Sequence, residues 1–496
     1  MQNVNVVPNW LMQRAYLTPQ RIAIKMGERE ITFDQLHNQV YQMAGRLHAM
    51  GIKRGANIAV LSHNSIEMIE ILHALKYIGA VTVLLNTRLT TNELLWQIEN
   101  AHVDFVLVES SMAKQLEGKS KARVVSFDAL YTIEPKKGEL HVVKEFSLDK
   151  PDTIMYTSGT TGNPKGVIQT YGNHYWSAIG SALNLGIEQE DCWLACVPFF
   201  HVSGLSILMR SVIYGMKVVV QDGFQAETVN KEIVNEKVTI ISVVSTMLQQ
   251  MIDHLDERGS GYPPSLRCVL LGGGPAPETL LEKSKLRNIP VFQTYGMTET
   301  ASQVVTLSSE YSLSKLGSAG KPLFHSQVKI VQNDVEQDND KPGEILVKGP
   351  TVSTGYWNCP DATKSSLKNG WLYTGDIGYL DADGFLYVLD RRKDLIISGG
   401  ENIYPAEIES VLLSHPEVAE AGVTGKEDLK WGQVPVAFVV LKNPISKEEL
   451  MAFCGEKLAR YKLPKAIYSV TSLPRNATNK LQRHKLLSLL DGTATI

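Results

Sequence analysis

The sequence predicts an α/β protein with a large N-terminal domain of mostly parallel sheets layered with helices, a β-rich lobe, and a small α+β domain at the C-terminus. Three observations support this prediction. Short apolar strands alternate with helical segments over much of the chain, which is typical of βαβ units. From about Gly317 the pattern changes to short strands and turns. After a dense charge cluster at 390–394, a last stretch of roughly 100 residues is long enough to fold alone.

The first part of the chain alternates regularly. Thr32-Phe33-Asp34-Gln35 has the form of a capping box, and Leu36, Val40, Met43 and Leu47 recur after it at helical spacing. Glycines at 51 and 55 end this helix. Further elements are predicted as strands at 58–61, 81–85 and 105–108, and helices at 66–78 and 91–99.

The alternation resumes after residue 170. We expect helices at 175–185 and 205–213, and strands at 193–197, 217–221, 239–244, 269–271 and 291–294. The strand at 269–271 ends in a glycine-rich turn, and the one at 291–294 ends in Tyr295-Gly296. Open α/β sheets bind ligands at the carboxyl ends of their strands, so these two turns are candidate binding positions. Strands at 344–348 and 385–389 belong to the β-rich lobe.

The charge cluster 390–394 lies between two apolar strands, 386–389 and 395–397. A charge run is usually a solvated face, but between two strands it also suits a hinge. A helix at 405–415, strands at 418–423 and 435–441, and a helix opened by Ser446-x-x-Glu449 follow. We therefore predict an N-terminal domain over 1–390, a hinge over 391–393 and a C-terminal domain over 394–496.

Composition excludes several functional classes. The 496-residue chain has a net charge of −3, 44% hydrophobic and 20% charged residues, which gives no basic bias toward nucleic acid or a membrane surface. No run approaches the ~18 apolar residues of a membrane span, and residues 1–8 do not resemble a secretory signal. We expect a cytoplasmic enzyme without membrane insertion, and an assembly of identical chains stays open.

The five cysteines are scattered and form no disulfide framework. Cys192, Cys196 and His201 could be interpreted as metal ligands, but the C-x₂-C spacing is absent. Because 193–200 has the pattern of a buried strand, we expect core thiols.

The stretch Tyr156-Thr157-Ser158-Gly159-Thr160-Thr161-Gly162-Asn163-Pro164-Lys165-Gly166 is too small and polar to form a core. Its glycines allow close approach of the backbone to a ligand, and its N–H and hydroxyl groups can surround an anion. Lys165 adds a positive charge. These features predict a phosphate-binding loop. It is not a Walker A motif, because Pro164 separates the glycine from the lysine.

This loop resembles the phosphate-binding signature of the adenylate-forming superfamily, which includes acyl-CoA synthetases, firefly-type luciferases and the adenylation domains of peptide synthetases. Segments 272–275, 295–299, 373–376 and 391–393 resemble the superfamily's further motifs, in the same order along the chain. Lys480 matches its C-terminal catalytic lysine, although Asn479 stands where the family usually has Gly. The resemblance covers essentially the whole chain.

The resemblance implies ATP and Mg²⁺ as cofactors and CoA as a co-substrate. A carboxylate first attacks the α-phosphate of ATP to give an acyl-adenylate, and the CoA thiol then displaces AMP. Glu299 is the implied Mg²⁺ ligand, and Glu299, Lys165, His201 and Lys480 are the implied catalytic residues. The implied ATP-binding residues are Thr157, Ser158, Gly159, Thr160, Thr161, Lys165, Gly273, Gly274, Pro275, Tyr295, Gly296, Thr298, Asp376 and Arg391. From the residues alone, we place the Asp376 carboxylate on a loop.

The resemblance also implies that the C-terminal domain is mobile and rotates about Lys393 between the two steps. Lys480 would face the site in the first step. The turn at 398–401 would face it in the second step, with Gly399, Gly400 and Glu401 lining a tunnel for CoA.

The acid substrate is a carboxylic acid whose pocket we expect at His201, Ser203, Gly296 and Ser302. A lone histidine beside an apolar strand is more often structural, but His201 matches a family position at the acyl pocket. Segments 8–11, 172–175, 181–186, 398–409 and 414–416 resemble the branch of acid–CoA ligases that use 2-succinylbenzoate in menaquinone biosynthesis. The expected acid follows from this resemblance alone.

Three other functions remain open. The chain could ligate CoA to a different aryl or fatty acid, or it could load a carrier protein, although no carrier domain is fused to it. It could also bind a nucleotide without catalysis, which the presence of both Glu299 and Lys480 argues against.

Overall fold

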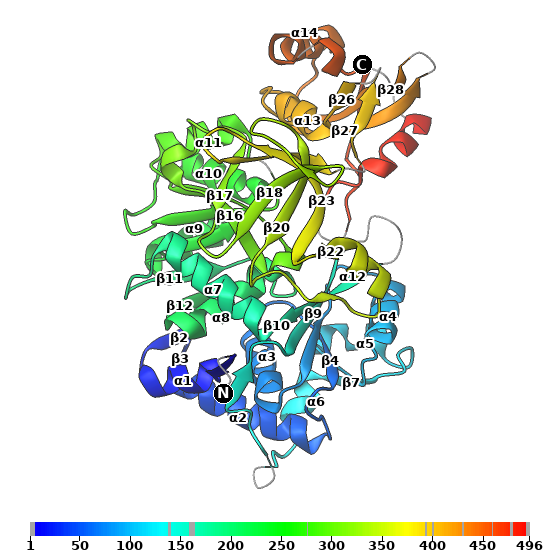
Figure 1. The fold of residues 1–496 in the computed structure, drawn as a ribbon. Helices are drawn as coiled ribbons and strands as arrows, with labels where there is room; N and C mark the ends of the chain where they lie inside the picture. Colours follow the sequence, from blue (N-terminus) through cyan, green and yellow to red (C-terminus); the bar gives the residue numbers. More distant parts are fainter. Residues whose placement is uncertain are drawn as a thin grey trace.

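The computed structural model describes residues 5–136, 140–157, 164–274, 276–391, 394–398, 401–428, 431–458, 460–476 and 480–492. Within these residues, helices and two large sheets alternate in layers, and the C-terminal residues form a separate body at one end (Figure 1). This is the mixed α/β architecture with a β-rich lobe and a smaller C-terminal unit that the sequence predicts.

The first sheet has its central strands parallel and two antiparallel strands at one edge. Its order is β21 (Gly355–Tyr356), β10 (Lys165–Thr170), β9 (Pro151–Thr157), β5 (Val81–Leu84), β4 (Asn57–Leu61), β6 (Phe105–Val108) and β7 (Arg123–Ser126). The central strands form because runs such as Ile58–Leu61 are apolar throughout and fully buried, as strands covered on both faces must be.

The second sheet is parallel at one end and antiparallel at the other. Its parallel part is β14 (Cys268–Leu271), β13 (Ile240–Val243), β11 (Cys192–Ala195), β12 (Lys217–Val220) and β2 (Ile22–Met26), edged by β3 (Arg29–Thr32). It continues through β15 (Val291–Met297), β16 (Ser302–Leu307) and β17 (Ser318–Pro322) into the β-rich lobe of β24 (Leu386–Arg391), β23 (Trp371–Leu380), β22 (Leu367–Lys368), β20 (Gly343–Lys348), β18 (Gln327–Gln332) and β19 (Val335–Glu336).

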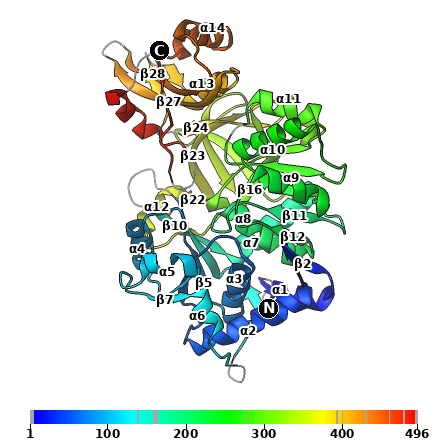
Figure 2. The same ribbon diagram turned by 180° about the vertical axis from the view of Figure 1, so that it is seen from behind.

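Helices cover both sheets and separate them. One apolar core joins β4 and β11 through the helices of the central layer, α2 (Phe33–Ala49), α3 (Ile66–Ile78), α7 (Tyr171–Leu185) and α8 (Val202–Tyr214). The far face of the first sheet packs on α4 (Thr91–Asn100) and α5 (Ala113–Leu116). The far face of the second packs on α9 (Ala226–Asn235), α10 (Ser245–Arg258) and α11 (Glu278–Leu286), which Figure 2 shows along one side.

Shorter elements complete the N-terminal part. They are α1 (Trp10–Leu17), α6 (Phe127–Tyr131), α12 (Pro360–Ser366) and the paired strands β1 (Val6–Pro8) and β8 (Glu145–Ser147). The Thr32 capping box is confirmed: its side chain accepts a hydrogen bond from Gln35 N, and Thr32 N donates to Gln35.

The C-terminal body has its own apolar core. Strands β26 (Glu401–Ile403), β25 (Ile396–Ser398), β28 (Gly432–Leu441), β27 (Val418–Asp428) and β29 (Ala466–Ser469) form its sheet, and α13 (Pro405–Leu413) and α14 (Lys447–Lys457) pack on it. Ser446 caps α14 by accepting from Glu449 N.

Three local predictions need correction. The segment Tyr373–Asp376 is not a loop but part of β23, because its backbone pairs with β20 and β24. The strand predicted to end at Thr294 continues to Met297, because β16 folds back along it. Asp390 and Arg391 belong to β24 rather than to a free charge cluster, since they pair with Ile377 and Asp376.

Candidate functional site

The phosphate-binding loop is predicted between two strands that form a hairpin. Thr157, the last residue of β9, lies opposite Lys165, the first residue of β10. The Thr157 hydroxyl donates to the Lys165 carbonyl at 3.5 Å. Ser158, Gly159, Thr160 and Thr161 lie outside the described residues. The two ends of the predicted loop therefore lie side by side, where β9 ends and β10 begins.

Lys165 and Glu299 both contact the side chain of Tyr356. The Lys165 ammonium lies 5.4 Å from the ring centroid of Tyr356, and the Tyr356 hydroxyl donates to Glu299 Oε1 at 3.0 Å. A cation over an aromatic face is attracted by the ring. Tyr356 lies next to β10 because Val167 pairs with it in the sheet. The sequence held no signal for Tyr356, because a two-residue strand has no periodicity.

Tyr295 and Asp376 form the second contact between predicted site residues. The Tyr295 hydroxyl donates to Asp376 Oδ2 at 2.8 Å, and Asp376 is only 7% exposed. Asp376 lies opposite Arg391 across β23 and β24. Gly273 follows β14 with a φ of +85°, a left-handed conformation that favours glycine. Gly274 follows it, and Pro275 lies outside the described residues.

The segment between β15 and β16 carries Glu299 on a tight bend, and Ser302 begins β16 directly after it. The pairing of β15 with β16 shifts between Tyr295 and Gly296. A Cβ at Gly296 would lie 2.1 Å from the Ser302 carbonyl oxygen. Thr298 starts a short 3₁₀ turn, and Ser302 has a φ of 102°. Only glycine at 296 permits this close approach of the two strands.

His201 ends the loop before α8, where it is half-buried beside Phe200, with 4.7 Å between the ring centroids. Burial lowers the pKa of His201 to about 4, and the positive charge of Arg88 acts in the same direction. Its imidazole is therefore neutral near pH 7. Ser203, in the first turn of α8, is exposed. His201 and Ser203 thus belong to one helix end, whereas Ser302 lies beside Arg210.

Arg210 is a candidate site residue that the sequence reasoning missed. It is 1% exposed on α8, its guanidinium carbon lies 5.1 Å from the Trp193 ring centroid, and its Nη2 lies 3.5 Å from Ser302 Oγ. Among the described residues no carboxylate pairs with it and its Nε has no hydrogen-bond partner. Burial lowers its pKa. An arginine inside the apolar run of α8 was the signal that could have identified it, because an unpaired buried cation is costly.

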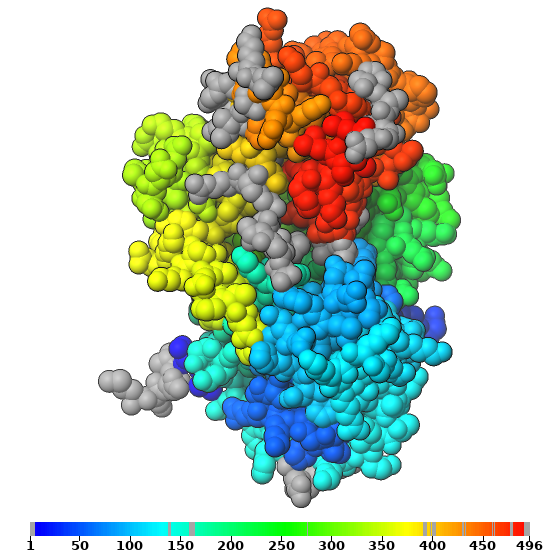
Figure 3. Space-filling model, turned by 90° about the vertical axis from the view of Figure 1, so that its right-hand side faces the viewer, coloured from blue at the N-terminus to red at the C-terminus, as the bar shows by residue number. Residues whose placement is uncertain are grey.

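Among the predicted residues of the C-terminal body, the structure describes Lys480 and the backbone of Glu401. Lys480 is exposed and its backbone bonds to Asn476: the Lys480 N–H donates to Asn476 Oδ1 at 2.8 Å, and the Asn476 N–H donates to Lys480 O at 2.9 Å. Glu401 starts β26. Lys393, Gly399 and Gly400 lie outside the described residues. Figure 3 shows the last, red segment of the chain between the yellow β-rich lobe and the green part of the N-terminal domain.

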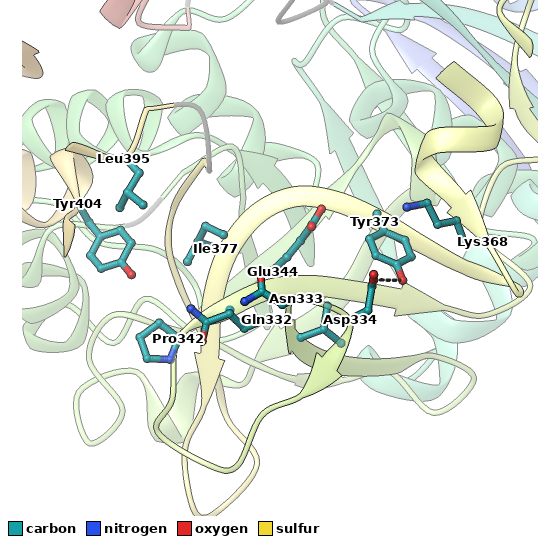
Figure 4. A pocket seen from close by; sticks show the side chains of 12 residues that line it. Gln332, Asn333, Asp334, Pro342, Glu344, Lys368, Tyr373, Ile377, Leu395 and Tyr404 are labelled. Carbon is teal, nitrogen blue, oxygen red and sulfur yellow. Dashed lines mark hydrogen bonds between the residues drawn. The ribbon is translucent and has the colours of Figure 1, made fainter. Parts of the chain in front are cut away.

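A cavity of about 390 Å³ lies behind the Asp376 strand (Figure 4). Tyr373 and Ile377 of β23 line it together with Leu395 and Tyr404 of the C-terminal body. Side chains alternate between the two faces of a strand. Asp376 therefore points away from this cavity, and its contact with Tyr295 lies on the opposite face of β23.

The donor set fits Mg²⁺ bound with phosphates rather than a metal held by protein alone. Within the described residues no group of three or more His, Cys, Asp or Glu side chains could hold a metal ion. Mg²⁺ commonly takes one or two carboxylates, with phosphate oxygens and waters as its other ligands. The Glu299 carboxylate, near Lys165, suits that arrangement. Cys192 and Cys196 are buried thiols whose pKa burial raises to about 12.

Comparison with known proteins decides the family. The family model of AMP-binding enzymes matches residues 11–357, and the model of the AMP-binding enzyme C-terminal domain matches residues 407–480. The chain belongs to the AMP-binding enzyme family. This confirms the adenylate-forming superfamily that the motifs indicate.

Other members of the AMP-binding enzyme family resemble the chain over its full length. A 2-succinylbenzoate–CoA ligase of Geobacillus sp. is 57% identical over 486 residues, 98% of each chain. The o-succinylbenzoate CoA synthetase of Bacillus subtilis, in complex with the acyl-adenylate intermediate OSB-AMP, has 51% identity and a TM-score of 0.93, covering 97% of this chain and 98% of that one. A double mutant of the Bacillus subtilis enzyme, bound to the product analogue OSB-NCoA, has 50% identity and a TM-score of 0.77, covering 99% and 100%.

In the described part of the chain, no helix has both the length and the apolar character needed to cross a membrane.

Proposed function

We propose that this chain is an ATP-dependent acid–CoA ligase of the AMP-forming type that acts on 2-succinylbenzoate in menaquinone biosynthesis. Its substrates are ATP, the acid and CoA. The observation that carries the proposal is full-length identity of 57% with a 2-succinylbenzoate–CoA ligase. An ATP site in this chain is supported by two sets of contacts. Lys165 and Glu299 both contact Tyr356, and Tyr295 contacts Asp376.

The first step joins two anions, so the site must stabilise negative charge. We assign Lys165 and the residues 157–161 to the phosphates, Tyr295 with Gly273 and Gly274 to the adenine, and Asp376 with Arg391 to the ribose hydroxyls. Lys480 would bridge the incoming carboxylate and the α-phosphate. Mg²⁺, held by Glu299 and the phosphates, supplies Lewis-acid stabilisation of the developing charge.

The acid pocket is assigned to His201, Ser203, Gly296 and Ser302, with Arg210 added from the structure. 2-Succinylbenzoate carries two carboxylates, and only one of them is activated. The other is an anion that needs a partner when it is bound. The buried guanidinium of Arg210, beside Ser302 and without a carboxylate partner among the described residues, matches that need.

The similarity to relatives solved with different ligands supports a domain orientation suited to the first step, adenylate formation. At nearly equal identity, the TM-score falls from 0.93 with the acyl-adenylate complex to 0.77 with the product-analogue complex. We infer that the C-terminal domain, predicted over 394–496, has the adenylate-forming orientation here. Rotation about Lys393 would then bring Gly399, Gly400 and Glu401 to the site for CoA. A cytoplasmic location, an assembly of identical chains and the absence of a nucleic-acid partner stay predictions.

The test compares acids in the wild type and in Arg210→Met, which keeps an unbranched apolar side chain while removing the charge. Pyrophosphate release is measured with 2-succinylbenzoate, with 4-oxo-4-phenylbutanoate, which lacks the ring carboxylate, and with decanoate. We expect the wild type to prefer 2-succinylbenzoate, and Arg210→Met to lose the preference over 4-oxo-4-phenylbutanoate by about tenfold or more, since charged hydrogen bonds contribute about 1.5–3 kcal/mol.

A wild type that prefers decanoate would overturn the substrate. An acyl-adenylate that forms but is not converted to a thioester by CoA would favour the carrier-loading alternative. Unchanged discrimination in Arg210→Met would remove Arg210 from the pocket and leave the reaction class intact.

A further inference from the structure

A buried hydrogen-bond chain connects the first sheet to the backbone of the segment that carries Glu299. The side-chain amide of Gln169 donates to the Thr298 carbonyl oxygen at 2.7 Å, and the Thr153 hydroxyl lies 3.0 Å from Gln169 Oε1. His174 Nε2 lies 3.0 Å from the same hydroxyl oxygen. Gln169 is 0% exposed, and Thr153 and His174 are also buried. The chain therefore has no competition from water along its length.

The chemistry of the groups gives this chain a single direction. A carbonyl oxygen only accepts, so Gln169 must present its NH₂ to Thr298 and its oxygen to Thr153. The Thr153 hydroxyl must then donate to Gln169, and its oxygen must accept from His174 Nε2–H. Burial lowers the pKa of His174 to about 4, which keeps this imidazole neutral near pH 7. Each member thus orients the next, ending at the peptide between Thr298 and Glu299.

Gln169 lies directly opposite Thr153, at the end of the regular pairing of β10 with β9. The pairing of β10 with β9 shifts between Gln169 and Thr170, and such bulges redirect side chains. Lys165 and Gln169 are four positions apart on the strand, so their side chains share one face. The Glu299 segment belongs to the second sheet, yet Tyr356 of the first sheet binds its carboxylate and Gln169 of the first sheet binds its backbone.

We propose that Gln169 is a positioning residue for adenylate formation, because its amide anchors the Thr298–Glu299 peptide to β10. This anchor holds the Glu299 carboxylate of the second sheet at a constant distance from the Lys165 ammonium of the first sheet. This inference rests on the proposed function, in which both groups act on Mg·ATP. A site that requires such groups within a few tenths of an ångström loses rate when their support is lost.

The experiment uses Gln169→Met, which keeps the side-chain length and removes both the donor and the acceptor. Thr153→Val removes the hydroxyl that orients Gln169, and Thr153→Ser restores it. Gln221→Met is the matched control, because Gln221 is also a buried glutamine but its amide has no hydrogen-bond partner among the described residues. Binding of Mn²⁺·ATP without acid is measured by electron paramagnetic resonance. Adenylate formation against Mg²⁺ concentration, and thioester formation from pre-formed acyl-adenylate and CoA, are measured separately.

We expect Gln169→Met to bind Mn²⁺·ATP about tenfold more weakly and to need about tenfold more Mg²⁺ for adenylation, as the loss of one buried hydrogen bond allows. Thioester formation should stay within about twofold of the wild type, because the metal-bound phosphates have left by then. Thr153→Val should show a smaller loss of the same kind, and Thr153→Ser and Gln221→Met should match the wild type.

Wild-type Mn²⁺·ATP binding in Gln169→Met would overturn the inference, as would an equal loss of both half-reactions, which indicates a structural role only. If the wild type forms no adenylate with any acid, the proposed function fails, and Mn²⁺·ATP binding still decides the role of Gln169.

Discussion

Tyr356 shows how single residues connect the predicted motifs. Its ring contacts Lys165 and its hydroxyl binds Glu299, so one side chain spans two motifs that are far apart in the sequence. The hydroxyl satisfies one carboxylate oxygen of Glu299 and orients the carboxylate. The tyrosine is therefore expected to limit the rotamers of both charged groups before ATP binds, which reduces the entropy lost on binding.

Lys480 is an exposed residue of the C-terminal body, and its backbone bonds to Asn476. We expect Lys480→Ala to slow adenylate formation by ~10²–10³-fold, as loss of a transition-state contact commonly does. Thioester formation from pre-formed acyl-adenylate should stay near the wild-type rate, because we assign the lysine to the first step only. Rapid-quench measurement of each half-reaction checks this.

Lys485→Ala is the control for Lys480→Ala, because Lys485 is another exposed lysine of the same C-terminal segment. Both variants should unfold within about 0.5 kcal/mol of the wild type. Normal adenylation by Lys480→Ala would show that the role assigned to this lysine is wrong.

At the scale of elements, the hairpin of β15 and β16 sets the position of the segment that carries Glu299. The register shift at Gly296 allows the chain to turn within a few residues, and the Ser353 N–H fixes the Glu299 carbonyl at 2.8 Å. The hairpin is therefore a support for Glu299 as well as a sheet edge.

Gly296→Ala should disturb this hairpin, since its Cβ would lie 2.1 Å from the Ser302 carbonyl oxygen, a backbone atom. We expect a loss of stability of about 1–3 kcal/mol and a larger relative loss of adenylation than of thioester formation. Urea unfolding and the two half-reaction rates measure these effects.

Gly223→Ala is the matched control for Gly296→Ala, because a Cβ at Gly223 would meet nothing within 4 Å. It should leave stability and both rates unchanged. A Gly296→Ala enzyme with wild-type stability and rates would show that the hairpin can relax without cost.

At the scale of the whole molecule, the central helical layer buries several histidines between the two sheets. Burial, with the charge of Lys76 acting in the same direction, lowers the pKa of His73 to about 3, and burial lowers the pKa of His174 and of His201 to about 4. The ordinary histidine pKa is 6.5. At a pH between these lowered values and 6.5, the histidines are therefore neutral in the folded protein but protonated in the unfolded chain.

The sign of the resulting pH dependence is determined by these pKa values. Above pH 6.5 both states are neutral at these histidines and the full stability is present. Below it the unfolded chain binds more protons, so the free energy of unfolding falls as the pH is lowered toward about 4, by ~1.4 kcal/mol per pH unit for each buried histidine. Between about pH 5 and pH 6, His73→Leu should therefore make the free energy of unfolding fall less steeply, by ~1.4 kcal/mol per pH unit.

Urea unfolding curves of the wild type and His73→Leu at these two pH values test the prediction. The carboxylates contribute equally to both proteins, so the difference between the slopes isolates His73. Identical slopes would show that His73 is not buried as a neutral group.

The sequence by itself determined the fold class, most of the strands and helices, and the family. This was possible because these properties depend on local patterns: the apolar runs of β4 and β6, the helical spacing of α2 and α3, and motifs such as 156–166, each of which lies within a short segment. The assignments of Lys165, Glu299, Asp376 and Lys480 to ATP also rest on such motifs, and they stay predictions.

Only the tertiary structure decided which residues connect the motifs. Tyr356 and Gln169 contact the Glu299 segment because two separate sheets meet there, and Arg210 reaches Ser302 because α8 packs beneath β16. The tertiary structure also placed Asp376 in a strand, since β23 pairs with β24 on one side and with β20, an earlier and more remote strand, on the other. Contacts between residues far apart in sequence depend on how buried surfaces pack, and no local pattern encodes that packing.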